Sequence, residues 1–157
     1  MNAITVITDT HGLDFSWSKL VNLPSNFDLL INLTSLDLTG CRLMNLASNC
    51  SLLTNLSFLS LAACGLDDLP IEFNLLTKLH TLSLSTNEFT TVPTVIEHLS
   101  NLKVLVLNGN KLVSIPGFVS KMDNSNRLDI PENPIRNVPT SLREKIWVLP
   151  FLARWSD

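Results

Sequence analysis

The feature that most constrains this chain is a repeat in which apolar residues recur every 23 positions. Three residues into each unit, one column is leucine in all six units: Leu13, Leu36, Leu59, Leu82, Leu105 and Leu128. A second apolar column follows two residues later: Phe15, Leu38, Leu61, Leu84, Leu107 and Ile130. Such a period predicts a stack of similar coils of chain, in which each coil covers the apolar side of its neighbour.

The two halves of each unit carry different periodicities. Alternating apolar residues such as Leu36 and Leu38 predict a short strand with one face inward. In the other half, apolar residues lie three apart, as in Phe73 and Leu76, which favours one or two helical turns. Proline stands where those turns would begin in five units of six: Pro24, Pro70, Pro93, Pro116 and Pro139. Because the two sides differ in width, we expect the stack to curve, with the strands on its concave face.

A polar column follows each strand and is expected to form a structural ladder between units. Its members after Ser18 are Cys41, Cys64, Asn87, Asn110 and Asn133. Amide side chains can donate to and accept from backbone groups that leave the sheet. Cys41 and Cys64 lie one unit apart, within the Cα separation that a disulfide needs, so both a disulfide and two reduced thiols stay open. Cys50 falls in an apolar column and is expected in the core.

The full pattern, L-x-x-L-x-L-x-x-N/C-x-L-x-x-L-P, resembles the leucine-rich repeat family. The 23-residue spacing is most similar to the intracellular class found in Ras-suppressor-type scaffold proteins and plant intracellular leucine-rich repeat proteins. The resemblance implies an α/β leucine-rich repeat solenoid of about six repeats. In this right-handed, curved coil, parallel strands line the concave face, and short helices or 3-10 turns line the convex face.

This fold predicts a three-part organisation of the chain. Residues 1–9 are expected to form an N-terminal cap or partial repeat, residues 10–147 the six repeats, and residues 148–157 a C-terminal cap tail. The first residues carry neither a basic segment nor a long apolar one, so we expect a cytoplasmic protein with reduced thiols. Export of an effector by another route is the alternative.

The sequence offers little for catalysis. His11, His80 and His98 are too widely separated along the repeats to act together, and no metal-binding, phosphate-binding or nucleophile motif is present. We therefore expect no enzyme activity, no cofactor and no metal site. The net charge of −3, without clustered Lys and Arg, argues against nucleic acid as a partner. The short apolar runs argue against a membrane span.

The remaining expectation is a protein–protein interaction module. Residues that point out of the concave sheet are not constrained by the repeat, so they are free to determine which partner binds. The candidate partner-binding residues are Phe58, Val104, Val106, Asp37, Thr81, Trp17 and Arg127. Aromatic and arginine side chains often dominate the energy of interfaces. By resemblance, the role is that of a scaffold, adaptor or inhibitor. A pathogen-delivered effector that binds a host protein and a structural, self-associating unit are the alternatives.

Two other apolar groups compete with this surface. Leu29, Leu52 and Leu75 share one column on the helical side, where they either tuck between neighbouring turns or form a self-association surface. Trp147, Phe151 and Trp155 lie near the C-terminal end of the sequence, where they either belong to the cap or contact a partner. The sequence does not identify the protein partner.

Overall fold

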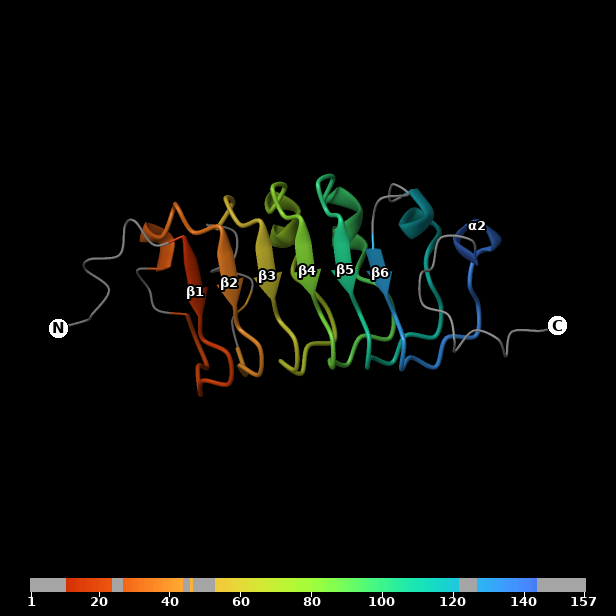
Figure 1. The fold of residues 1–157 in the computed structure, drawn as a ribbon. Helices are drawn as coiled ribbons and strands as arrows, with labels where there is room; N and C mark the ends of the chain where they lie inside the picture. The colour runs from red at the N-terminus through yellow and green to blue at the C-terminus, as the bar shows by residue number, and fades with distance from the viewer. Residues whose placement is uncertain (1–10, 24–26, 44–45, 47–52, 122–126, 144–157) are drawn as a thin grey trace.

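The computed structural model describes residues 11–23, 27–43, 46, 53–121 and 127–143. Six three-residue strands run side by side in one parallel sheet, in chain order from β1 to β6 (Figure 1). Their bounds are Gly12–Asp14 (β1), Ser35–Asp37 (β2), Phe58–Ser60 (β3), Thr81–Ser83 (β4), Val104–Val106 (β5) and Arg127–Asp129 (β6). This arrangement confirms the predicted solenoid of about six repeats.

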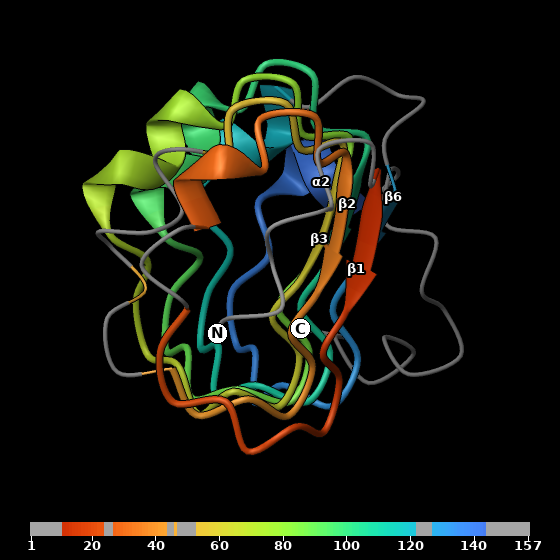
Figure 2. The same ribbon diagram turned by 90° about the vertical axis from the view of Figure 1, so that its left-hand side faces the viewer.

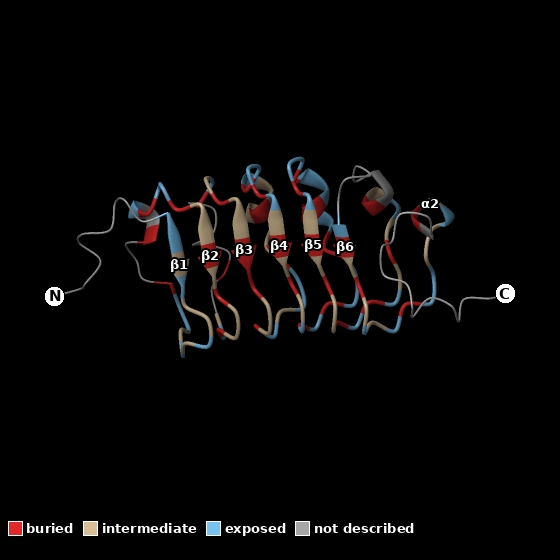
Figure 3. Cartoon of the chain, viewed as in Figure 1, coloured by how far each residue is buried: buried red, intermediate tan, exposed pale blue. Residues whose placement is uncertain are grey.

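The register of the sheet follows the 23-residue period without a shift. Leu36 pairs with Leu59, and Leu59 pairs with Leu82, so the leucine column of the sequence forms a straight row across the strands. These three leucines are fully buried. A band of buried residues crosses β2 to β6 at one height (Figure 3). A leucine side chain buried to this extent contributes roughly 1.5–3 kcal/mol to folding.

The side opposite the sheet carries short 3-10 helices, as Figure 2 shows along the stack. They are η1 (Phe27–Leu29), η2 (Ile71–Leu75), η3 (Thr94–His98) and η4 (Gly117–Lys121), and a four-residue helix, α2 (Thr140–Arg143), follows β6. Pro70, Pro93, Pro116 and Pro139 each lie one position before the first helical residue, and Pro24 lies outside the described residues. The Pro70 carbonyl accepts from Phe73 N at 3.1 Å, and the Pro93 carbonyl accepts from Ile96 N at 3.2 Å.

Each strand is followed by a turn whose backbone has a positive φ. The six residues in this column, with φ between 54° and 72°, are Trp17, Gly40, Ala63, Thr86, Gly109 and Glu132. Only two of them are glycine, the residue that adopts this conformation without strain. The turn directs a backbone N–H to the next unit: Ala63 N donates to Ser85 O at 2.9 Å, and Thr86 N donates to Asn108 O at 2.8 Å.

The described part of the first unit is less tightly packed than the central ones. Leu13 and Phe15 are partly buried, whereas their counterparts Leu36 and Leu38 are fully buried. Among the described residues, the first unit has a neighbouring unit on one side only, which accounts for the difference. The predicted cap at residues 1–9 and the tail at residues 148–157 lie outside the described residues.

Candidate functional site

The structural ladder makes the turns after the strands rigid. Asn87 Nδ2 donates to Leu61 O at 2.8 Å and to Leu84 O at 3.0 Å, while Asn87 Oδ1 accepts from Cys64 N and Leu66 N, both at 3.0 Å. Asn110 repeats the arrangement one unit later, donating to Leu84 O and Leu107 O at 2.9 Å. Each side chain therefore connects two consecutive units.

Asn133 completes the amide part of the ladder. Its Nδ2 donates to Leu107 O at 2.8 Å and to Ile130 O at 2.9 Å, and its Oδ1 accepts from Leu112 N at 2.9 Å. Among the residues that the structure describes, no buried side-chain nitrogen or oxygen lacks a hydrogen-bond partner. The polar interior of the solenoid is thus satisfied, and the sheet above it is held in one geometry.

The two ladder cysteines are free thiols. Cys41 Sγ donates to Phe15 O at 3.3 Å, and Cys64 Sγ donates to Leu38 O at 3.2 Å, as an asparagine at the same position would. Burial raises the pKa of the Cys64 thiol to about 11. Of the two alternatives for this pair, a disulfide or two reduced thiols, the structure has the reduced thiols. Cys50 lies outside the described residues.

The outward face of the sheet, which we call the sheet face, consists of two rows in register. The first row is Gly12, Ser35, Phe58, Thr81, Val104 and Arg127, and the second is Asp14, Asp37, Ser60, Ser83, Val106 and Asp129. Six of the seven predicted partner-binding residues lie in these rows, and Trp17 lies in the turn after β1. Thr81 separates Phe58 from Val104, so these side chains stand two strand spacings apart.

The apolar members of the sheet face are less accessible than the sequence suggested. Phe58, Val104 and Val106 point out of the sheet but are half-buried rather than freely exposed. Ser60, on the same face, is buried at 5 % exposure, and its hydroxyl lies 2.7 Å from that of Thr39. Packing against neighbours in the same rows explains the difference, because each side chain shields those next to it. The centre of the sheet therefore presents a shallow surface of mostly uncharged side chains.

Charges on the sheet face lie at its two ends. Asp14 and Asp37 are paired in register on β1 and β2, and Asp129 lies on β6 with Arg127. Arg127 Nη2 lies 3.3 Å from Asp129 Oδ2, so these two charges offset each other. Asp14 has no such partner in the described chain. Hydrogen bonds from the Ser16 hydroxyl and backbone amide lower the pKa of Asp14, which keeps its carboxylate ionised.

Trp17 lies against the next unit while most of its surface stays in solvent. Trp17 is 73 % exposed. A Cβ added to Gly40 would come within 2.5 Å of Trp17 Cε3, so the indole rests directly on that glycine. The sequence indicated Trp17 as a candidate partner-binding residue. It did not reveal Gly40 as the supporting surface.

The helical side presents a second set of exposed apolar residues. Leu29 is 61 % exposed and Leu75 is 49 % exposed, so these two do not tuck between neighbouring turns. Ile31 and Ile71, at 62 % and 64 %, were not anticipated. Leu52, Trp147, Phe151 and Trp155, which the sequence also suggested for self-association, lie outside the described residues.

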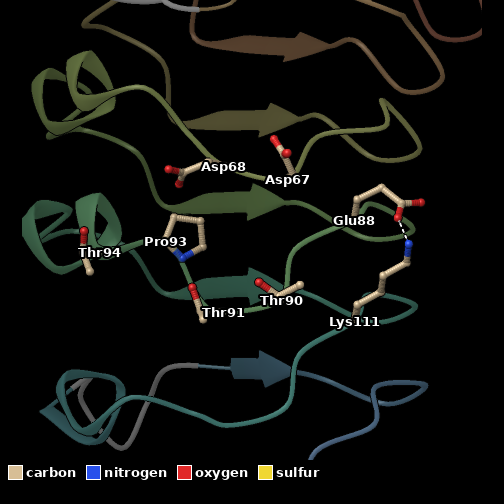
Figure 4. Close-up of a pocket in the computed structure, with 8 residues that line it drawn as sticks. All are labelled: Asp67, Asp68, Glu88, Thr90, Thr91, Pro93, Thr94 and Lys111. Atoms are coloured by element: carbon tan, nitrogen blue, oxygen red, sulfur yellow. Dashed lines mark ion pairs between the residues drawn. The ribbon is translucent and has the colours of Figure 1, made fainter.

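An open cavity of about 590 Å³ is lined by residues that follow the ladder positions of the third, fourth and fifth repeats (Figure 4). Its lining residues are Asp67, Asp68, Glu88, Thr90, Thr91, Pro93, Thr94 and Lys111. Glu88 and Lys111 point toward each other and form an ion pair, and Asp68 Oδ1 accepts from Leu69 N at 2.8 Å. Asp67 and Asp68 are both exposed.

Within the described ranges, no three His, Cys, Asp or Glu side chains come together in a way that could hold a metal ion. No helix in the same ranges is long and apolar enough to cross a bilayer.

Comparisons with known proteins agree with this geometry. A family model described as "Leucine rich repeat" matches residues 77–135, and a second, described as "Leucine Rich Repeat", matches residues 32–54. The two segments together cover just over half of the chain and coincide with the repeats of the sheet. The chain belongs to the leucine-rich repeat family. No curated protein matches this leucine-rich repeat chain at a significant level.

Solved structures of other leucine-rich repeat proteins are similar. One of Leptospira interrogans is 32 % identical, with a TM-score of 0.79 over 86 % of this chain and 34 % of that one. The leucine-rich repeat domain of the type III effector XopL is 23 % identical (TM-score 0.73, 87 % of this chain, 50 % of that one). A structure of the Toll–Spatzle complex of Drosophila gives 18 % identity and a TM-score of 0.63, over 88 % of this chain and 26 % of that one. The chain thus spans about a third of the Leptospira protein, and the latter two likenesses show the fold alone.

Proposed function

We propose that this chain binds a protein partner through the sheet face and acts by binding, without chemistry of its own. Leucine-rich repeat domains generally serve as protein–protein interaction modules, and the chain has the repeats of that family at residues 32–54 and 77–135. The observation that carries the proposal is the register of the sheet, which brings Phe58, Val104 and Val106 onto one outward face.

The rigidity of the scaffold supports binding. Asn87, Asn110 and Asn133 tie the turns of successive units together, so the strands do not have to become ordered when a partner arrives. A surface already held in its bound geometry loses less conformational entropy on association. Half-buried apolar side chains with small neighbours such as Thr81 and Ser83 leave room for the close approach of another chain.

Scaffold, adaptor, inhibitor and delivered effector are all roles that such a face can serve, and the identity of the partner distinguishes among them. We infer a reducing, intracellular compartment, because Cys41 and Cys64 are free thiols in adjacent units. The spacing of 23 residues also favours the intracellular class of repeats.

The test is affinity capture from cells with the wild type and with a Phe58→Asp/Val106→Asp variant. We expect the variant to lose specific partners, since two carboxylates would face the apolar surface of the partner. The matched control is Ile71→Asp/Val113→Asp, which places the same charges at exposed apolar sites away from the sheet. Circular dichroism must show that all three proteins are folded.

The outcome is read from the two variants together. Loss of the same captured proteins only with Phe58→Asp/Val106→Asp supports the sheet face. Unchanged capture with that variant, or equal loss with the control, contradicts it.

Self-association through the helical side is a second candidate, favoured by the exposure of Leu29 and Leu75. A Leu29→Glu/Leu75→Glu variant tests it by light scattering after size exclusion. If the mass of the wild type rises with concentration and that of the variant does not, the helical side is an interface. A wild-type mass that stays at one chain over the same range excludes it.

A further inference from the structure

The β1–β2 end of the sheet face differs from the rest of the sheet in charge. Asp14 and Asp37 stand directly opposite each other on adjacent parallel strands. Like charges in directly opposed positions destabilise a sheet unless a cation or solvent screens them. Each carboxylate uses one oxygen locally: Asp14 Oδ1 accepts from Ser16 N, and Asp37 Oδ1 accepts from Thr39 N, both at 2.8 Å. Neither aspartate forms an ion pair with another described residue.

An exposed aromatic residue, Trp17, lies in the turn that follows β1 and its Asp14. Trp17 follows Asp14 by three residues, and its indole lies on Gly40. Gly40 follows Thr39, whose backbone N–H donates to the Asp37 carboxylate. One side of the ring is therefore occupied by the backbone of the next unit, and its 73 % exposure leaves the other side open. A cation beside an indole gains electrostatic attraction from the ring, and this attraction adds to that of a carboxylate.

The opposite end of the sheet lacks this character, because Arg127 and Asp129 already pair with each other. The centre, around Phe58 and Val104, carries no charge. The sheet face is thus polarised along the stack, from an unpaired acidic and aromatic end at β1–β2 to an apolar centre.

We propose that the protein partner inserts a lysine or arginine side chain at Asp14, Asp37 and Trp17, and lays apolar side chains of the same segment on Phe58, Val104 and Val106. This inference rests on the proposed function and specifies the chemistry of its partner. It combines charge complementarity at one end with an unpartnered apolar surface beside it.

The spacing of the strands sets the spacing within the partner. Asp37 on β2 lies one strand from Phe58 on β3 and three strands from Val106 on β5. At about 4.8 Å per strand, and with Phe58 also displaced two residues along the strand from Asp37, these separations are about 8 and 14 Å. An extended chain advances about 3.3 Å per residue, so the partner segment carries its basic residue about two to four positions from its apolar ones.

The experiment selects randomised 12-residue peptides displayed on phage against the full 157-residue chain. Selected peptides are then synthesised and measured by fluorescence anisotropy against variants. We expect sequences with a lysine or arginine two to four positions from an aromatic or aliphatic residue. An Asp14→Asn/Asp37→Asn variant should bind these peptides at least tenfold more weakly at low salt, and Trp17→Ala about fivefold more weakly.

The matched control is Asp67→Asn/Asp68→Asn, which removes two exposed carboxylates outside the sheet face and should leave binding unchanged. One outcome would overturn this inference and leave the proposed function standing. In that outcome the selected peptides bind Phe58→Ser/Val106→Ser more weakly, but they carry no preferred basic residue and bind Asp14→Asn/Asp37→Asn as tightly as the wild type. Peptides indifferent to Phe58→Ser/Val106→Ser, or a selection that yields no binder, would count against both.

Discussion

Asn87 and Asn110, one repeat apart, donate to the same acceptor: the Leu84 carbonyl receives Asn87 Nδ2 at 3.0 Å and Asn110 Nδ2 at 2.9 Å. Replacing Asn87 with alanine removes this donor and also leaves two inward N–H groups, those of Cys64 and Leu66, without their acceptor. Because an unsatisfied buried polar group costs about 1–3 kcal/mol, Asn87→Ala should lower the free energy of unfolding by about 3 kcal/mol. Urea denaturation followed by circular dichroism measures it.

Asn101 supplies the control for this prediction. Its exposed side chain makes one hydrogen bond, to Thr77 O at 2.7 Å. Asn101→Ala should cost at most about 1 kcal/mol. Equal losses from the two substitutions would show that the ladder does not contribute as described.

The left-handed turns predict a difference between two glycines. Gly109 has a φ of 67°, and an added Cβ would meet the Thr86 hydroxyl at 3.4 Å. Gly109→Ala should therefore lower the free energy of unfolding by about 1 kcal/mol or more. Gly117, whose added Cβ would meet nothing within 4 Å, is the comparison. Gly117→Ala should be neutral or slightly stabilising, since alanine restricts the unfolded chain. Thermal melts of both variants decide, and a more stable Gly109→Ala would contradict the turn geometry.

A charge in the leucine row should unfold the chain. Leu82 is fully buried between Leu59 and Leu105, so Leu82→Asp places an unpaired carboxylate in the core at a cost of about 4 kcal/mol or more. Thr81→Asp, one residue away but on the outward face, should leave the fold intact. Far-ultraviolet circular dichroism distinguishes the two, and a folded Leu82→Asp protein would refute the assignment of the inward face.

The cysteine ladder predicts low thiol reactivity and sensitivity to alkali. In a Cys50→Ala background, Cys41 and Cys64 should resist iodoacetamide at pH 7 when folded and react after denaturation, because both are buried.

The pKa of Cys64 is raised from 9.0 to about 11, so the folded state favours the protonated thiol. Its contribution to stability is therefore complete below pH 9 and falls as the pH rises toward 11. Cys64→Ser should weaken that alkaline loss, and an unchanged pH profile would contradict the assignment.

Much of the fold was predictable because the repeat is local and strict. The rows of Leu36, Leu59 and Leu82, and the ladder of Asn87, Asn110 and Asn133, follow from the 23-residue period alone. The left-handed column was not predictable, since Trp17 and Thr86 do not have the side chains that such a turn favours. Hydrogen bonds to the next unit impose the conformation instead.

The candidate site was only partly predictable, for a related reason. The alternation of side chains along a strand places Phe58 on the outward face. Its exposure depends on side chains from other units that the register of the sheet brings beside it. The pairing of Asp14 with Asp37, and the contact of Trp17 with Gly40, likewise arise between residues 23 positions apart. The sequence of a single unit therefore shows which residues face outward, but it does not show which residues of other units lie beside them.

The most direct test of the central claim is photocrosslinking in cells with benzoylphenylalanine at single positions. Substitution at Phe58 samples the sheet face, and substitution at Leu75 samples the helical side. The account predicts a discrete protein adduct from position 58 after irradiation and none of the same mass from position 75. An adduct from position 75 alone would contradict the claim that the sheet face binds the partner.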